Sequence, residues 1–173
     1  TVVIKPSPYT PLGTLRMVEL LNEVLPPGVL NAVSGTDELG QWMTEHPGIK
    51  KIVFTGSCAT GKKVMASAAG NLKRLTLELG GKSANIVLED ADLEKAVEVC
   101  ARARMVNAGQ SCIAAKRFIV VEPLRELFEQ MLVARLRTEV MGDPQDEQTT
   151  LGPLARIDIR HELQEQVRQS VRM

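Results

Sequence analysis

The stretch Lys51-Ile52-Val53-Phe54-Thr55-Gly56-Ser57 decides the fold, because an apolar strand runs directly into a glycine turn that opens a helix. The helix predicted after this turn covers about residues 59–69, and a second strand follows over residues 72–79. The sequence Leu75-Thr76-Leu77-Glu78-Leu79 alternates apolar and polar residues, as a strand with one buried face does. Strand, helix and strand in this order are the unit from which parallel sheets are built, so the sequence predicts an α/β fold.

The same alternation of strands and helices extends in both directions from this unit. We predict four further strands, over residues 1–4, 29–33, 85–88 and 117–121. The predicted helices between and after them cover residues 10–25, 37–46, 92–106 and 124–140, with a polar helix at the end of the chain. This order favours a parallel, doubly wound sheet, with a domain boundary near Gly80 that separates residues 1–79 from residues 80–173.

Composition excludes several classes of protein. The 173 residues carry 21 Lys and Arg against 21 Asp and Glu, so no basic excess points to nucleic acid. No apolar run approaches a membrane span, and the three cysteines do not form a disulfide framework. No cluster of residues has the spacing of metal ligands. We expect a cytoplasmic protein that binds neither nucleic acid nor a membrane.

The two ends of the sequence differ from those of most domains. The chain begins with Thr1 inside a predicted strand, and it stops at Met173 inside a predicted helix without a stop signal. These ends favour a segment of a longer polypeptide.

Cys112 is the candidate nucleophile. It lies in the string Asn107-Ala108-Gly109-Gln110-Ser111-Cys112-Ile113-Ala114, a glycine-containing turn between a predicted helix and a predicted strand. A thiol on such a turn is placed to react, whereas the common alternative for a lone cysteine is an inert, buried position. Cys58 is a rival thiol at the start of a helix, for which we favour a passive role, and Cys100 is expected in the core.

Glu78 is the candidate general base. It closes an apolar strand, where a carboxylate costs free energy to bury unless it has a partner. Partial burial would suit a group that takes a proton from water. The alternative is an ion pair with Lys82 or Lys73.

Two further segments can bind a phosphate-containing ligand. The turn Gly56-Ser57-Cys58-Ala59-Thr60-Gly61 opens a helix, where backbone N–H groups attract anions, although its spacing matches neither the Rossmann fingerprint nor the phosphate loop. Lys5-Pro6-Ser7-Pro8 follows the first strand, and in a continuous sheet it would share the edge of the Ser57 turn. The alternatives are an ordinary strand-to-helix turn and a solvated lysine.

Together these residues resemble the NAD(P)-dependent aldehyde dehydrogenase superfamily. The matching strings, in family order and with Cys112 lying 34 residues after Glu78, are Lys5-Pro6-Ser7, Phe54-Thr55-Gly56-Ser57, Glu78-Leu79-Gly80-Gly81-Lys82 and Gly109-Gln110-Ser111-Cys112. The resemblance covers essentially the whole chain and the middle of the family's polypeptide. It implies part of a Rossmann-type parallel-sheet cofactor domain over residues 1–79, followed by part of an α/β catalytic domain over residues 80–173.

The resemblance also implies a reaction and the residues that perform it. An aldehyde is oxidised to a carboxylic acid with NAD or NADP, through a thiohemiacetal and then a thioester on Cys112, and Glu78 acts as the general base. The residues that the resemblance assigns to cofactor binding are Lys5, Ser7, Pro8, Gly56, Ser57, Gly61 and Leu79. By resemblance the full-length protein is a homo-oligomer.

The sequence departs from the family pattern at three places. Pro8 stands where members often carry an acidic residue that holds the ribose, which leaves the choice between NAD and NADP open. The family's oxyanion-stabilising Asn would precede Thr1, and a Glu that orients the nicotinamide ribose would follow Met173. We therefore expect the isolated chain to show no turnover.

The substrate and two other functions stay open. The strings Cys112-Ile113-Ala114-Ala115-Lys116-Arg117-Phe118 and Leu151-Gly152-Pro153-Leu154-Ala155-Arg156 are similar to the succinate-semialdehyde dehydrogenase branch, while the first half resembles general aldehyde dehydrogenases. The alternatives are a segment with no activity of its own, and a thiol-dependent esterase or acyl-transfer enzyme that uses Cys112 without a dinucleotide.

Overall fold

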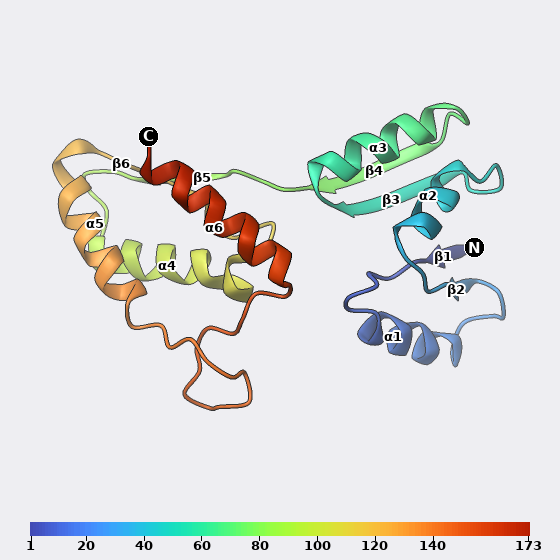
Figure 1. The fold of residues 1–173 in the computed structure, drawn as a ribbon, viewed down its shortest axis with the longest axis horizontal. Helices are drawn as coiled ribbons and strands as arrows, with labels where there is room; N and C mark the ends of the chain where they lie inside the picture. The colour runs from blue at the N-terminus through green and yellow to red at the C-terminus, as the bar shows by residue number, and fades with distance from the viewer. The chain divides into compact units, whose positions relative to one another are not determined.

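The computed structural model describes residues 1–173, which divide into two compact units, Thr1–Leu79 and Gly80–Met173 (Figure 1). The first unit consists of β1 (Val2–Ile4), α1 (Leu12–Asn22), β2 (Leu30–Ala32), α2 (Asp37–Glu45), β3 (Lys51–Gly56), α3 (Cys58–Ala69) and β4 (Arg74–Leu79). The second consists of β5 (Ala84–Val87), α4 (Leu93–Met105), the 3-10 turn η1 (Val106–Gly109), β6 (Arg117–Val120), α5 (Glu122–Leu136) and α6 (Ile157–Val171).

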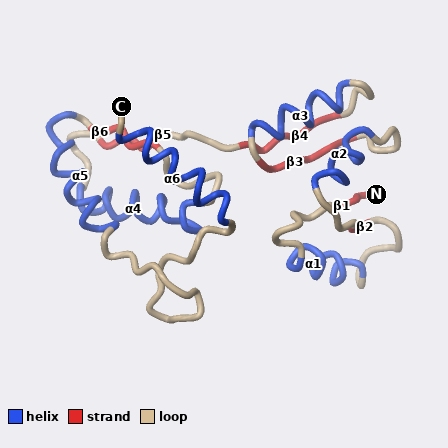
Figure 2. Tube along the Cα trace, viewed as in Figure 1, coloured by secondary structure: helices blue, strands red, loops and turns tan.

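Every named strand pairs in parallel, which confirms the predicted α/β class. The strands form three separate pairs, β1 with β2, β3 with β4 and β5 with β6, rather than one continuous sheet (Figure 2). In the longest pair Thr55 lies opposite Glu78, and Gly56 lies opposite Leu79. The carboxyl ends of β3 and β4 therefore meet, as they do in any parallel pair in this register.

Helix α3 covers one face of the β3–β4 pair (Figure 1). Burial follows the predicted alternation, since Leu75, Leu77 and Leu79 are half-buried while the residues between them are exposed. The opposite face is open, and Val53 is 67% exposed there. The sequence pattern thus fixes which side chains of β4 face the helix and which face away.

Lys73 ties the end of α2 to the turn before β4. Its side chain is buried, and its ammonium donates to the carbonyls of His46 at 2.6 Å and Ile49 at 2.8 Å. The Nδ2 of Asn71 donates to the carbonyl of Glu45, the last residue of α2. A buried ammonium needs such acceptors. The carbonyls of His46 and Ile49 lie just after α2 and accept no hydrogen bond from within that helix, so they are available to Lys73.

The core of the second unit lies between α4, α5 and the β5–β6 pair. It is built from Val87, Val97, Cys100 and Phe128, and the ring of Phe128 tilts against that of Phe118 with 6.1 Å between centroids. Because α4 and β6 both pack on this core, the segment that joins them is anchored at each end.

Helix starts differ from the sequence prediction by one or two residues where proline is involved. Helix α5 begins at Glu122 rather than Leu124, with Pro123 in its first turn, where a missing N–H costs no hydrogen bond. Helix α1 has Pro11 rather than Thr10 as its N-cap. The predicted cap of α4 is confirmed, because the carboxylate of Asp92 accepts from the N–H of Lys95 at 3.1 Å.

None of the helices combines the length and the apolar character needed to cross a membrane. No group of three or more His, Cys, Asp or Glu side chains is arranged to hold a metal ion.

Candidate active site

Ser57 caps the helix that follows β3. Its Oγ accepts from the N–H of Thr60 at 3.1 Å and donates to the hydroxyl of Thr60 at 3.0 Å. The N–H groups of Cys58 and Ala59 donate no hydrogen bond, and both residues are exposed. Unpartnered N–H groups at a helix N-terminus, beside an exposed hydroxyl, suit an anionic group such as a pyrophosphate.

Gly61 lets this helix approach the end of β4. It is buried, and a Cβ at its position would lie 2.7 Å from Cδ2 of Leu79. Gly56 is also crowded, because its Cβ would lie 2.5 Å from the ring of Phe54. Both glycines therefore shape the turn by close packing, and the Ser57 turn and the end of β4 form one local structure.

Glu78 is exposed, so the partial burial that would suit a general base is not present in this structure. It lies on the face of β4 that points away from α3, where it alternates with the half-buried leucines. No ion pair engages Glu78, and Lys73 instead donates to main-chain carbonyls. The carboxylate is thus free of protein partners, as a group that takes a proton from water needs to be.

Lys5 crosses the start of α2. Its ammonium donates to the carbonyls of Pro6 at 2.9 Å and Gly35 at 3.3 Å, and a Cβ on Gly40 would lie 3.5 Å from Cε of Lys5. Ser7 and Pro8 are exposed, and the Oγ of Ser7 accepts from the N–H of Tyr9. These residues belong to the β1–β2 pair, whereas the Ser57 turn belongs to the β3–β4 pair, so the predicted common sheet edge is not formed by strand pairing.

Cys112 lies on an exposed β-turn. The N–H of Ala114 donates to the carbonyl of Ser111 at 3.1 Å and closes the turn, and the N–H of Ile113 donates to the Oγ of Ser111 at 3.4 Å. The N–H of Cys112 itself donates no hydrogen bond. The thiol is exposed, which excludes the buried alternative, whereas Cys100 is only 5% exposed and burial raises the pKa of its thiol.

A left-handed stretch of backbone leads into this turn. Asn107, Ala108 and Gly109 have φ values of 51°, 54° and 76°. This conformation costs about 1–2 kcal/mol for a residue with a Cβ, so it persists only where its surroundings hold it. Here the guanidinium of Arg104 donates to the carbonyl of Gly109 at 2.6 Å and to that of Ala115.

Lys116 contacts the turn from its other end. Its ammonium donates to the carbonyls of Cys112 at 2.9 Å, Ala114 at 3.1 Å and Ser111 at 3.4 Å. Sequence reasoning missed both Arg104 and Lys116. A cation that binds main-chain carbonyls leaves no pattern in residue types, because every residue offers the same acceptor.

Two other segments lie against the Cys112 turn. A Cβ on Gly81 would lie 3.6 Å from the carbonyl oxygen of Cys112, so the segment that begins three residues after Glu78 passes beside the turn. The Oε1 of Gln110 accepts from the N–H of Ala155 at 3.1 Å. This bond joins the turn to the string that resembles the succinate-semialdehyde branch.

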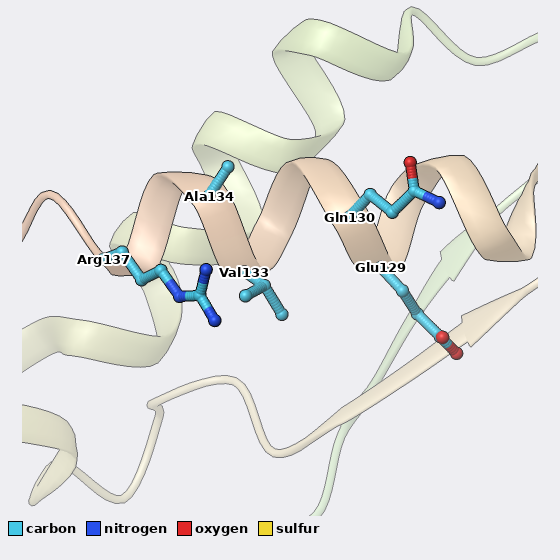
Figure 3. A pocket seen from close by; sticks show the side chains of 5 residues that line it. All are labelled: Glu129, Gln130, Val133, Ala134 and Arg137. Atoms are coloured by element: carbon cyan, nitrogen blue, oxygen red, sulfur yellow. The ribbon is translucent and has the colours of Figure 1, made fainter.

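An open groove elsewhere in the second unit contains none of the predicted site residues. Helix α5 alone lines it, as Figure 3 shows, with Glu129, Gln130, Val133, Ala134 and Arg137.

The sequence matches the family described as "Aldehyde dehydrogenase family" over residues 1–172. The chain belongs to this family. The match covers both units, including the Ser57 turn, Glu78 and Cys112.

Solved aldehyde dehydrogenase structures and one further protein share the fold of this chain closely. PnpE from Pseudomonas sp. WBC-3 is 44% identical with a TM-score of 0.94, over 99% of this chain and 36% of that chain. Aldehyde dehydrogenase C from Pseudomonas syringae, a mutant in complex with NAD+ and octanal, is 43% identical with a TM-score of 0.90, over 95% and 34%. Betaine aldehyde dehydrogenase from Staphylococcus aureus, in complex with NAD+, is 36% identical with a TM-score of 0.92, over 96% and 34%. The chain thus spans about a third of the length of the structures that it matches.

Proposed function

We propose that the full-length protein containing this chain oxidises an aldehyde to a carboxylic acid, with Cys112 as nucleophile and Glu78 as general base. The observation that carries the proposal is the exposed Cys112 thiol beside its own unpartnered N–H, on a turn held by two cations. A nucleophile and a donor for the developing oxyanion then occupy the same residue.

The first step forms a bond between the sulfur of Cys112 and the aldehyde carbon. The thiolate supplies the electron pair, and the π electrons of the carbonyl move to its oxygen, which becomes an oxyanion. The N–H of Cys112 is free to donate to this oxygen, and preorganised donors of this kind contribute most when no other group competes for them.

A nicotinamide dinucleotide supplies the chemistry that the chain lacks, because its ring accepts the hydride that leaves the tetrahedral carbon. The unpartnered N–H groups of Cys58 and Ala59 and the hydroxyl of Ser57 fit its pyrophosphate. Gly56 and Gly61 shape that turn, while Lys5, Ser7 and Pro8 would bind the adenosine part of the dinucleotide and the main chain of Leu79 would bind its nicotinamide part. NAD+ in two of the similar structures supports this choice, and NADP+ stays the alternative.

The second half of the reaction releases the acid from the Cys112 thioester. Glu78 takes a proton from water, the hydroxide oxygen bonds to the thioester carbon, and the carbon–sulfur bond breaks to regenerate the thiolate. The absence of any protein partner for the Glu78 carboxylate supports this role.

Succinate semialdehyde is the substrate that we propose. The residues after Cys112 and the string from Leu151 to Arg156 resemble that branch, and the bond between Gln110 and Ala155 joins the second string to the residues just before Cys112. A kcat/KM for succinate semialdehyde at or below that for butanal, an uncharged aldehyde of equal carbon number, would remove this assignment. We also infer that the full-length protein is a cytoplasmic homo-oligomer, which sedimentation and fractionation test.

Replacing Cys112 by Ala in the full-length protein tests the reaction itself. We expect NAD(P)H production from aldehyde to fall to the background, while dinucleotide affinity measured by calorimetry stays within about threefold, because the Ser57 turn is unchanged. Retained NAD(P)H production in Cys112→Ala contradicts the proposal. Ester hydrolysis that depends on Cys112, in a protein with no affinity for NAD or NADP, would favour the dinucleotide-free enzyme instead.

A further inference from the structure

Two cations hold five main-chain carbonyls around the proposed nucleophile. Lys116 binds the carbonyls of Ser111, Cys112 and Ala114, and Arg104 binds those of Gly109 and Ala115. An ammonium has three N–H donors, and Lys116 directs them to three convergent acceptors. Neither side chain forms an ion pair.

The direction of one carbonyl fixes the direction of the neighbouring N–H. The peptide bond is planar and trans throughout this chain, so the C=O of Ser111 and the N–H of Cys112 point in opposite directions. The carbonyl of Ser111 is held toward the turn interior by the ammonium of Lys116 and the N–H of Ala114. The N–H of Cys112 must then point out of the turn, where it has no partner.

A rotation of this peptide would reverse the electrostatics beside the thiol. It would place a carbonyl dipole, with its negative end outward, where the N–H now stands, and an oxyanion would meet repulsion instead of a donor. The Ser111–Cys112 peptide precedes the central peptide of the turn, and its rotation would break both the turn-closing bond from the N–H of Ala114 and the bond from Lys116, so these two donors together hold the N–H of Cys112 outward.

We propose that Lys116 is a positioning residue that keeps the N–H of Cys112 directed at the reacting carbonyl oxygen, with Arg104 bracing the left-handed backbone that leads into the turn. This inference rests on the proposed function, since it assigns a role within the same site. The proposed role of Lys116 requires no contact with substrate or cofactor. It acts through the main chain, and its effect appears only in reactions that form an oxyanion.

The test compares three reactions of Cys112 in the full-length protein carrying Lys116→Met. Aldehyde oxidation with saturating dinucleotide and hydrolysis of p-nitrophenyl acetate without dinucleotide both pass through an oxyanion. Alkylation by iodoacetamide displaces iodide and forms none. We expect kcat for the first two reactions to fall by about 10- to 100-fold, less than the full loss of an oxyanion donor, while the alkylation rate stays within about threefold.

Matched variants separate positioning from folding. Lys95→Met removes an exposed lysine of α4 by the same change and should leave all three rates within about twofold. Lys116→Arg keeps the charge, but its planar fork matches three convergent carbonyls poorly, so we expect a rate between those of Lys116→Met and the unaltered protein. If Lys116→Met does not fold, the rates of oxidation, ester hydrolysis and alkylation are compared in Lys116→Arg and Arg104→Lys instead.

The outcomes distinguish this inference from the proposed function. Unchanged oxidation and ester hydrolysis in Lys116→Met, or an alkylation rate that falls in parallel with them, overturns the positioning role while the function of Cys112 stands. Loss of ester hydrolysis with alkylation retained supports it, even in a protein that proves unable to bind a dinucleotide. Retained NAD(P)H production in Cys112→Ala overturns the function and the inference together.

Discussion

The core of the second unit is most sharply tested at Phe128. This side chain is 2% exposed, and its ring packs against Phe118 and against Val97 and Cys100 of α4. Replacing Phe128 by Ala removes a ring from a closed space between two helices and a strand pair. Such a change costs the transfer free energy of the ring and leaves a cavity, for a total of about 3–5 kcal/mol.

The size of this loss depends on burial, and the same helix offers a control. Gln130 is exposed two residues further along α5, and its only side-chain bond is to Glu126 at the surface. We expect Gln130→Ala to change the free energy of unfolding by less than about 0.5 kcal/mol. Phe128→Leu keeps most of the buried volume and should cost less than half of the Phe128→Ala loss.

Urea unfolding of the full-length protein, followed by circular dichroism, measures these differences. Phe128→Ala should move the transition that reports the second unit to lower urea, with the slope of the transition unchanged. A loss below about 1 kcal/mol, or a loss equal to that of Gln130→Ala, would show that this core is not closed around Phe128 and would refute the packing argument.

Three further predictions follow from single residues. Leu72→Gly should raise the free energy of unfolding by about 0.5–1 kcal/mol, because Leu72 has a φ of 50° and is 92% exposed, so relief of left-handed strain outweighs the added freedom of the unfolded chain. Leu72→Ala keeps the strain and should show no gain in the same urea assay. A gain equal to that of Leu72→Gly would contradict this reason. Ser57→Ala should weaken dinucleotide binding in calorimetry and lower stability by about 1 kcal/mol, since it removes the cap of α3, and unchanged binding would contradict the proposed pyrophosphate site. Iodoacetamide at neutral pH should label Cys58 and Cys112 but reach Cys100 only after denaturation, because burial raises the pKa of the Cys100 thiol and blocks access; peptide mapping that finds Cys100 labelled at the rate of Cys112 would be inconsistent with the core described.

Local patterns in the sequence predict most of the elements. Alternation in residues 75–79 identifies both the strand and its buried face, and Asp92 identifies the start of α4 by the hydrogen bond that its side chain offers. Boundaries shift where proline can occupy either the cap or the first turn, as at Pro11 and Pro123. Strand partners are not predictable in this way, because pairing depends on contacts distant in sequence.

In the site, some residues can be recognised from residue type and order, whereas others are found only in the three-dimensional structure. Cys112, Glu78 and Ser57 are recognisable because their chemistry and order are distinctive. Glu78 is exposed because it lies on the face of β4 that points away from α3. The free-energy cost of burying a carboxylate could not by itself predict whether Glu78 is buried with a partner or exposed. Arg104 and Lys116 escape sequence reasoning, since they act on main-chain carbonyls and depend on the left-handed backbone at Asn107 and Ala108.

The central claim is that a thioester forms on Cys112 and that Glu78 activates the water that releases it. Glu78→Gln in the full-length protein tests both halves at once, since hydride transfer should proceed while hydrolysis stalls. We expect a burst of about one NAD(P)H per active site followed by slow turnover, with the acyl group found on the Cys112 peptide by mass spectrometry. Steady turnover at the unaltered rate, or an acyl group on any other residue, would contradict the account.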